Sequence, residues 1–333
     1  MRPRLTDTVA VTVPLVVLLV SVIVAVLMQA ANHHPGRSSE PPVRVVGPSS
    51  PPTDGPHPQH TPRNETPQSL GSATGSACVP QHQKRTITVV TYNIHSALGH
   101  GRGVQLATIA DELKRWHADI ALLQEVDRFR GWTGRVDMPS VLAGRLGFAW
   151  TFGDNVSGAG GSQYGTAILS RYPILSSHNT ALPDPPGTQQ RGLLHVRIDV
   201  DGSPLSVYNT HLEHSSPTAR LAQIRKVVGI VGTDQLPVLL GGDLNATPGS
   251  PVLGVARTAL TDTWADVGSG EGRTVPKARI DYQLHRSGDR TGTLTPLRAF
   301  VLTSRVSDHD ALWARYRLTT GAGRICVPLI SEQ

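Results

Sequence analysis

The stretch from residue 236 to 250, LPVLLGGDLNATPGS, constrains the fold more than any other part of the chain. Its apolar and small residues predict a short strand that is buried on both faces and stops at Gly241-Gly242. Asp243 and Asn245 follow at once, ahead of a Pro-Gly turn. These polar residues form either a solvated Asx turn or part of a site at the end of a rigid strand. The stretch alone leaves both interpretations open.

The N-terminal region contains a candidate membrane segment. Residues 9–31 are an apolar run without charges, long enough to cross a bilayer core of about 30 Å at about 1.5 Å per residue. Arg2 and Arg4 precede the run and predict that residues 1–8 are cytoplasmic. A cleaved signal peptide is the alternative, but its apolar region would be shorter, about 7–15 residues, and would end in a better cleavage site. We therefore expect an uncleaved signal anchor, with the rest of the chain outside the cytoplasm.

The remaining chain divides by composition into a linker, a domain and a tail. Residues 32–84 are rich in Pro, Ser, Gly, Thr and His, which predicts a disordered linker. Residues 85–320 carry the regular apolar patterning of one catalytic domain, and residues 321–333 form a C-terminal tail. The formal net charge of +6 is divided evenly between residues 1–85 and the rest. The domain is thus only mildly basic, so a broad nucleic-acid surface is possible but not favoured.

The pattern predicts an α/β fold with a mixed sheet system, because strands alternate with helices and some successive strands are expected to form hairpins. Strands are expected at 86–94, 118–126, 278–284, 296–302 and 310–318, and as a succession through 164–212. Helices are expected at 103–117, 137–146 and 217–233, and a short one near 251–258.

Polar side chains recur where these strands begin or end. They are Asn93, Glu125, Asn209 with His211, Asp243 with Asn245, Asp281, and Asp308 with His309. Each one alone is most simply a turn residue or a side chain that faces water. Six such places in one domain predict instead that the strand ends converge on a single site.

The residue types indicate metal-assisted hydrolysis of a phosphoester. Asn93, Glu125 and Asp308 offer hard oxygen ligands, which suit Mg²⁺ or Mn²⁺. The imidazoles of His211 and His309 provide acid–base groups near neutral pH. No nucleophile elbow is evident, so water is the simplest attacking group.

Seven stretches in this order resemble the endonuclease/exonuclease/phosphatase superfamily. They are TYNIHSA, LLQEVD, YGTAILSRYPI, NTHLEH, GGDLNATP, RIDYQL and SDHDALWARY, and together they cover about 86–318. The resemblance implies a four-layer α/β sandwich, in which two mixed β-sheets pack face to face with helices outside.

The resemblance also implies a role for each polar residue. Asn93 and Glu125 would bind the metal, with Asp308 nearby. His211 would contact or protonate the departing phosphoester, while Asp243 and Asn245 would position the water. Asp281 would orient His309 as the general base. The positions that would contact substrate are Tyr164, Arg191 and Asn209.

Two departures from secreted nucleases of this superfamily bear on substrate. Asp127 stands where those nucleases have a basic residue that reaches DNA, and Thr166 stands where they have a Glu that supports a catalytic His. We therefore expect a monomeric, membrane-anchored phosphodiesterase or phosphatase that acts on lipid head groups or small phosphoesters outside the cytoplasm. The alternatives are an extracytoplasmic nuclease and an inactive binding module.

The two cysteines, Cys78 and Cys326, lie near the two ends of the domain. The first and last strands are neighbours in the superfamily fold, and each cysteine lies just beyond one of them. The resemblance therefore implies a disulfide between them, which a location outside the cytoplasm would permit. Two unrelated free thiols are the alternative.

Overall fold

The computed structural model describes residues 76–101, 103–288 and 291–328. The predicted anchor at 9–31 lies outside these residues, as do 1–8, most of the linker and the end of the tail. Among the helices of the described residues, none is long and apolar enough to cross a membrane.

The described chain forms two six-stranded mixed sheets. In spatial order, the first sheet consists of β11 (Thr293–Leu302), β12 (Ala311–Pro328), β1 (Ser76–Asn93), β2 (Ile120–Arg128), β4 (Gln163–Ser170) and β3 (Ala149–Ser157). The second sheet consists of β5 (Ile174–Ala181), β6 (Gly192–Val200), β7 (Ser203–His211), β8 (Val238–Asp243), β10 (Asp281–Arg286) and β9 (Thr261–Asp262). Each sheet contains one parallel pair, β1 with β2 and β7 with β8, and its other pairs are antiparallel.

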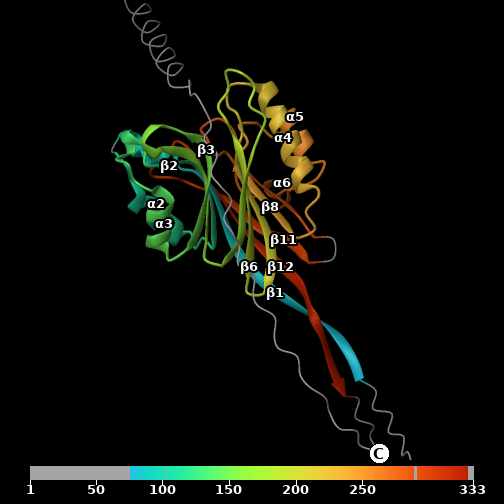
Figure 1. Ribbon diagram of the computed structural model, residues 1–333. Coiled ribbons are helices and arrows are strands. Elements are labelled where there is room, and N and C mark those ends of the chain that lie inside the picture. The colour runs from blue at the N-terminus through green and yellow to red at the C-terminus, as the bar shows by residue number, and fades with distance from the viewer. Residues whose placement is uncertain (1–75, 102, 289–290, 329–333) are drawn as a thin grey trace, which may run out of the picture. The chain divides into compact units, whose positions relative to one another are not determined.

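Helices cover the outer faces of the two sheets (Figure 1). The α-helices are α2 (Leu106–Arg115), α3 (Met138–Leu146), α4 (Pro217–Val231), α5 (Pro251–Ala256) and α6 (Thr263–Val267). Short 3₁₀ turns are η2 (His95–Ala97), η3 (Gly99–Gly101), η4 (Gly131–Thr133) and η5 (Ala159–Gly161). Helices α2 and α3 lie on the first sheet, and α4 and α5 lie on the second.

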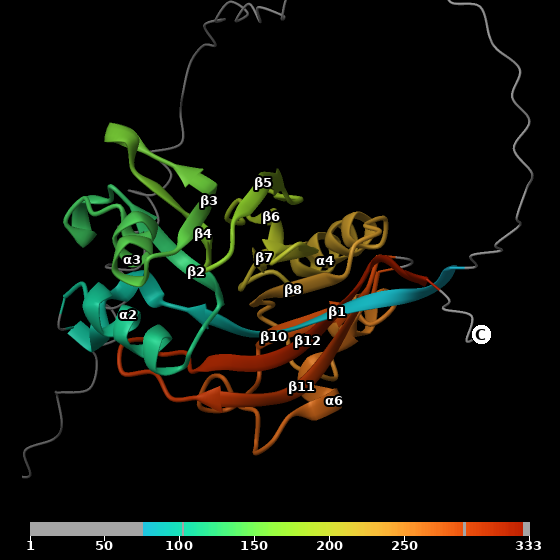
Figure 2. The same ribbon diagram turned by 90° about the horizontal axis from the view of Figure 1, so that it is seen from below.

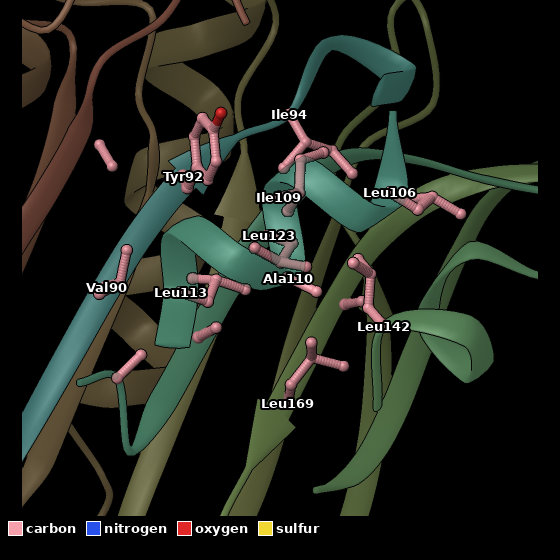
Figure 3. Close-up of a cluster of buried hydrophobic side chains, with 14 of the residues drawn as sticks. Val90, Tyr92, Ile94, Leu106, Ile109, Ala110, Leu113, Leu123, Leu142 and Leu169 are labelled. Carbon is pink, nitrogen blue, oxygen red and sulfur yellow. The ribbon is translucent and has the colours of Figure 1, made fainter. Parts of the chain in front are cut away.

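Three apolar clusters hold these layers together. The central one joins the sheets and includes Val89 and Leu122 of the first and Val207 of the second. A second cluster packs α2 and α3 on the first sheet, where Ile109 of α2 lies near Leu123 of β2 (Figure 3). A third packs α4 and α5 on the second sheet. The predicted sandwich of two mixed sheets with helices outside is therefore confirmed.

The predicted strands and helices correspond to observed ones, with four differences. β8 does not stop at the paired glycines but continues through them to Asp243. β3 was not predicted, because its residues are mostly half-buried and show no clear alternation. β9 and the five-residue helix α6, just before Gly268, were also not predicted.

The first and last strands are longer than the sequence indicates. β1 begins at Ser76, before the expected domain start at residue 85, and β12 continues to Pro328. The two strands pair with each other along this length. The composition of the predicted linker and tail did not indicate this two-stranded ribbon. Figure 1 shows this pair extending past the other strands, and Figure 2 shows β12 between β11 and β1.

Candidate active site

Two strands of the first sheet and three of the second meet at one edge of the sandwich. β1 and β2 are parallel, so Asn93 and its neighbour Gln124 reach the same edge of the first sheet. In the second sheet Asp243 is paired with His211 on one side and with Asp281 on the other. Strand pairing alone therefore gathers the two acidic residues and one imidazole.

Glu125 is directed to this edge by a β-bulge. The pairing of β2 with β4 shifts between Leu123 and Val126, and Glu125 has a left-handed φ of 55°. A bulge re-aims a side chain that a regular strand would hold on the other face. The strained backbone at Glu125 is thus part of how the site is built.

Asn93 links the acidic groups of the two sheets. Its side-chain amide donates to Glu125 Oε1 at 2.9 Å and to Asp243 Oδ2 at 3.2 Å. The Ser307 hydroxyl holds the backbone carbonyl of Asn93 at 2.7 Å. The predicted convergence of Asn93, Glu125 and Asp243 is therefore observed.

Asp281 and His309 form a buried pair. His309 Nδ1 lies 2.9 Å from Asp281 Oδ2, and its Nε2 lies 3.9 Å from Asp243 Oδ2. Burial opposes the imidazolium charge, but the hydrogen bond and charge of Asp281 raise the pKa of His309 to about 9. His309 is therefore the protonated imidazole of the site at neutral pH.

His211 is in the opposite state. Burial, together with the nearby positive charge of Arg191, lowers the pKa of His211 well below its usual value. The Asn245 amide lies 3.1 Å from His211 Nε2, and His211 Nδ1 has no hydrogen-bond partner. Thr166, in the place of the nuclease Glu, is buried, and its hydroxyl is also without a partner. Burial therefore favours the neutral form of His211, whereas Asp281 favours the charged form of His309, and the division of acid and base roles between them stays a prediction.

Arg191 supplies a buried positive charge. It is 3% exposed, and its Nε lies 3.6 Å from Glu213 Oε2. Burial opposes ionisation of Glu213, but the hydrogen bonds from Ser215 and the charge of Arg191 lower the pKa of Glu213 to about 2. The charged Glu213 therefore fixes Arg191 at the wall of the site.

These groups surround a pocket of about 270 Å³. Its lining residues are Glu125, Tyr164, Gln189, Arg191, His211, His214, Asp243, Asn245 and His309. Sequence reasoning missed Gln189, Glu213 and His214, although the last two directly follow the motif NTHL. Glu125 and His309, from different sheets, share this pocket.

Asp308 lies at a rim beside the pocket. Its side chain is 60% exposed, and its Oδ1 lies 3.3 Å from His95 Nδ1. It lines a neighbouring hollow of about 890 Å³. His95 was not predicted. In the sequence, the one indication was its position two residues after Asn93. The structure places it in a turn where three consecutive residues have a left-handed φ.

Asn209 lies beneath the pocket. It is fully buried, and its amide donates at 2.9 Å to the carbonyls of Leu123 and Ala167 in the first sheet. Its Oδ1 accepts from Gln124 at 2.7 Å. The structure therefore does not bring Asn209 to the substrate pocket: both donors of its amide join the two sheets.

Asp127 points inward. Its side chain is fully buried and lies 3.2 Å from the Thr133 hydroxyl and 3.4 Å from Arg130 Nη1. Asp127 therefore does not bear on substrate as the comparison with secreted nucleases implied, because its carboxylate faces the protein.

The oxygen donors of the site fit a divalent cation. Burial, and then the charge of Asp281, raise the pKa of Asp243, and Asp281 Oδ1 is buried without a hydrogen-bond partner. Such crowded carboxylates are what a cation would stabilise. Glu125 and Asn93 would hold Mg²⁺ or Mn²⁺ through oxygen. Asp243, Asp281 and His309 lie close enough to share an ion, but the imidazole suits Mg²⁺ less well.

The arrangement is suited to hydrolysis at phosphorus. A bound cation would neutralise charge on the phosphoryl oxygens. Arg191 provides a second positive charge for the same oxygens. His211 and His309 supply the two imidazoles that could move protons between the attacking water and the departing oxygen. The fold is thus a two-sheet sandwich, and its pocket holds the groups that hydrolysis of a phosphoester requires.

Comparisons with known proteins agree with this class. Residues 90–309 match the Endonuclease/Exonuclease/phosphatase family, and the chain belongs to that family. Family members hydrolyse phosphoesters with the help of a metal ion. The chain is 27% identical over 165 residues to Protein cwh43 of Schizosaccharomyces pombe, covering 49% of this chain and 17% of that protein. The match thus spans less than a fifth of that curated relative.

Solved structures share the fold. An endonuclease/exonuclease/phosphatase from Beutenbergia cavernae has a TM-score of 0.58 at 27% identity, covering 70% of this chain and 72% of that one. The human Nocturnin catalytic domain with bound sulfate has a TM-score of 0.55 at 21% identity, covering 72% of this chain and 97% of that one.

Proposed function

We propose that this protein is a Mg²⁺- or Mn²⁺-dependent phosphoester hydrolase that uses water as the nucleophile. The observation that carries the proposal is the contact of Asn93 with both Glu125 and Asp243, since it brings the oxygen donors of the two sheets together. Arg191 and His309 place positive charge at the same pocket.

The experiment is a substrate panel with metal exchange. We expect phosphate release or ester cleavage with Mg²⁺ or Mn²⁺, and its loss with EDTA. Glu125→Gln should reduce kcat by about 100-fold or more, because a developing charge loses its stabilisation. Calorimetry with Mn²⁺ should show weaker binding to this variant. Turnover that is unchanged by both EDTA and Glu125→Gln would contradict the proposal.

The membrane anchor and the extracytoplasmic location are part of the proposal. The apolar run 9–31 supports both, and the arginines before it give the orientation. We propose a monomer tethered by this run. Protease protection of intact cells or spheroplasts would test the orientation, since an external domain would be digested without lysis.

The substrate is either a lipid head group or small phosphoester, or a nucleotide-bearing phosphodiester. The buried Asp127 removes one argument against the second class, because its charge does not face the pocket. Assays on phospholipid vesicles, plasmid DNA and small diesters separate these classes. Cleavage of DNA alone would exclude the lipid reading.

We also propose a disulfide between Cys78 and Cys326. The register of β1 and β12 places these two residues directly opposite each other. Opposed residues of antiparallel strands have Cα atoms about 4.5–5.5 Å apart, which is within the range that a disulfide spans.

A further inference from the structure

Next to the pocket, an exposed tryptophan ring stacks against an arginine guanidinium. Trp132 is 63% exposed, and the Arg130 guanidinium lies 3.8 Å from the centre of its ring. The same guanidinium lies 5.0 Å from the centre of the Tyr164 ring, which lines the catalytic pocket. Tyr164, Arg130 and Trp132, here called the ring platform, therefore lead from the pocket wall to solvent.

The ring platform is held in place from below. Arg130 Nη1 lies 3.4 Å from the buried Asp127 carboxylate. The Arg130 carbonyl accepts from the backbone N–H groups of Thr133 and Arg135 at 3.3 and 2.8 Å. The loop is closed at its base, where Arg128 donates twice to Asp137 at 2.9 and 2.8 Å. Trp132 is thus presented to solvent by a tied loop, so little ordering is needed when a ligand binds.

The chemistry of the ring platform selects among ligands. Its exposed indole offers a broad apolar surface for stacking. The cation on its other face, Arg130, weakens its attraction for a second cation such as a choline group. The charge of Arg130 does not weaken the stacking of a neutral planar ring on the indole. Stacking on aromatic side chains is how proteins hold nucleobases without reading their sequence.

We propose that the ring platform is a binding site for a nucleobase that is attached to the phosphoester in the pocket. This inference rests on the proposed function and narrows its substrate class to nucleotide-bearing phosphodiesters. Exposed single hydrophobic residues are ordinary on protein surfaces. Trp132 differs because its ring stacks on Arg130 and its loop is held by hydrogen bonds. Only the Arg130 side chain separates it from Tyr164.

The test uses three diesters that share a p-nitrophenolate leaving group, with thymidine 5′-phosphate, methyl phosphate or phosphorylcholine as the remainder. The full-length protein is assayed in detergent with Mg²⁺ or Mn²⁺. We expect wild type to prefer the thymidine ester. Trp132→Ala should lower kcat/KM for that ester by about 5- to 100-fold and leave the other two unchanged. Leu175→Ala removes the other large apolar side chain that is exposed among the described residues, and it should change none of the three rates.

Three outcomes would overturn the inference. A selective loss on the phosphorylcholine ester would make the ring platform a cation site. An equal loss on all three esters would show that Trp132 only supports the loop. Unchanged rates with weaker binding to anionic vesicles would make Trp132 a membrane contact.

Failure of the proposed function would be recognised separately. If wild type cleaves neither these esters nor any substrate of the panel described above with either metal, the hydrolase proposal fails, and ring binding is tested directly. AMP, but not ribose 5-phosphate, should quench the fluorescence of wild type, and Trp132→Phe should abolish that quenching. Equal responses to both ligands would overturn the base site even then.

Discussion

Asp281 and His309 are the pair of residues on which the charge of the pocket depends. Both are buried, so each would be costly alone, and breaking such a pair usually costs more than the pair contributes. Asp243 faces the imidazole from the next strand, and Asp308 also favours its charge. Three carboxylates therefore stabilise the charge of the imidazolium, and one of them, Asp281, is hydrogen-bonded to it.

The charge of His309 can be measured directly. In EDTA, its imidazole should titrate by NMR at a pKa of about 9 in wild type. Asp281→Asn should bring that pKa below the usual value of about 6.5, because burial would then dominate. Asp266→Asn, a change near the different imidazole of His285, should leave His309 unaffected. A pKa near 9 in Asp281→Asn would contradict the assignment of its cause.

The same shift predicts a dependence of stability on pH. The pKa of His309 is raised in the folded state, so its contribution to the free energy of unfolding is complete below about pH 6.5. It is lost as pH rises through about 9. Urea unfolding in EDTA should show this decrease, on the order of 3 kcal/mol, in wild type and not in Asp281→Asn. A decrease of equal size in both proteins would assign it to other groups.

Asn209 is predicted to act on stability. Asn209→Ala should lower the free energy of unfolding by about 2–4 kcal/mol, because the buried carbonyls of Leu123 and Ala167 would lose their shared donor. KM for a small soluble ester should change little. A raised KM with unchanged stability would restore Asn209 as a substrate contact.

Among the elements, β8 shows how closely the two sheets approach below the site. A Cβ at Gly241 would collide with Leu122 of the first sheet, and one at Gly242 would collide with the carbonyl oxygen of Thr210. Gly242 also has a φ of +152°, which favours glycine. The two glycines let β8 pass through this contact and deliver Asp243 at its end.

Gly242→Ala is therefore expected to destabilise the protein by about 3 kcal/mol, from the clash and the strained φ together. Gly254→Ala is the matched control. This glycine lies in α5 with open space around its Cβ position, so the change should stabilise by about 0.5–1 kcal/mol. Urea unfolding curves measure both, and a Gly242→Ala protein as stable as wild type would refute the predicted clash with Thr210 of the neighbouring strand β7.

The sequence predicted which strands carry the site but not how each side chain is turned. Asp243, His211 and Asp281 were predictable because neighbouring strand ends meet at one edge. The direction of Glu125 depends on a bulge in the pairing with β4, which is a non-local feature. Asp127 was misread for the same reason, since its partner Arg130 lies on a loop whose fold the local sequence does not specify. β3 escaped prediction because only one of its nine residues is buried.

For the whole molecule, the pairing of β1 with β12 joins the beginning of the described chain to its end. Most of their register is continuous, and it includes the opposed Cys78 and Cys326. A covalent link there would close nearly the entire domain into one loop.

Thiol titration of the unreduced, denatured protein should find no free thiol. Reduction should lower the free energy of unfolding by on the order of 4–5 kcal/mol in the chain-entropy model, less any strain. Cys78→Ser/Cys326→Ser should match the reduced wild type and be insensitive to reductant. Two reactive thiols before reduction would exclude the disulfide.

The length of β1 sets the distance between the start of the domain and its pocket. Ser76 and Asn93 are the two ends of an 18-residue strand, which at about 3.3 Å per residue is nearly 60 Å long. A tether joined to the domain ahead of Ser76 would thus be attached at the opposite end of β1 from the catalytic pocket. An attachment there would leave the surface around the pocket free for substrate.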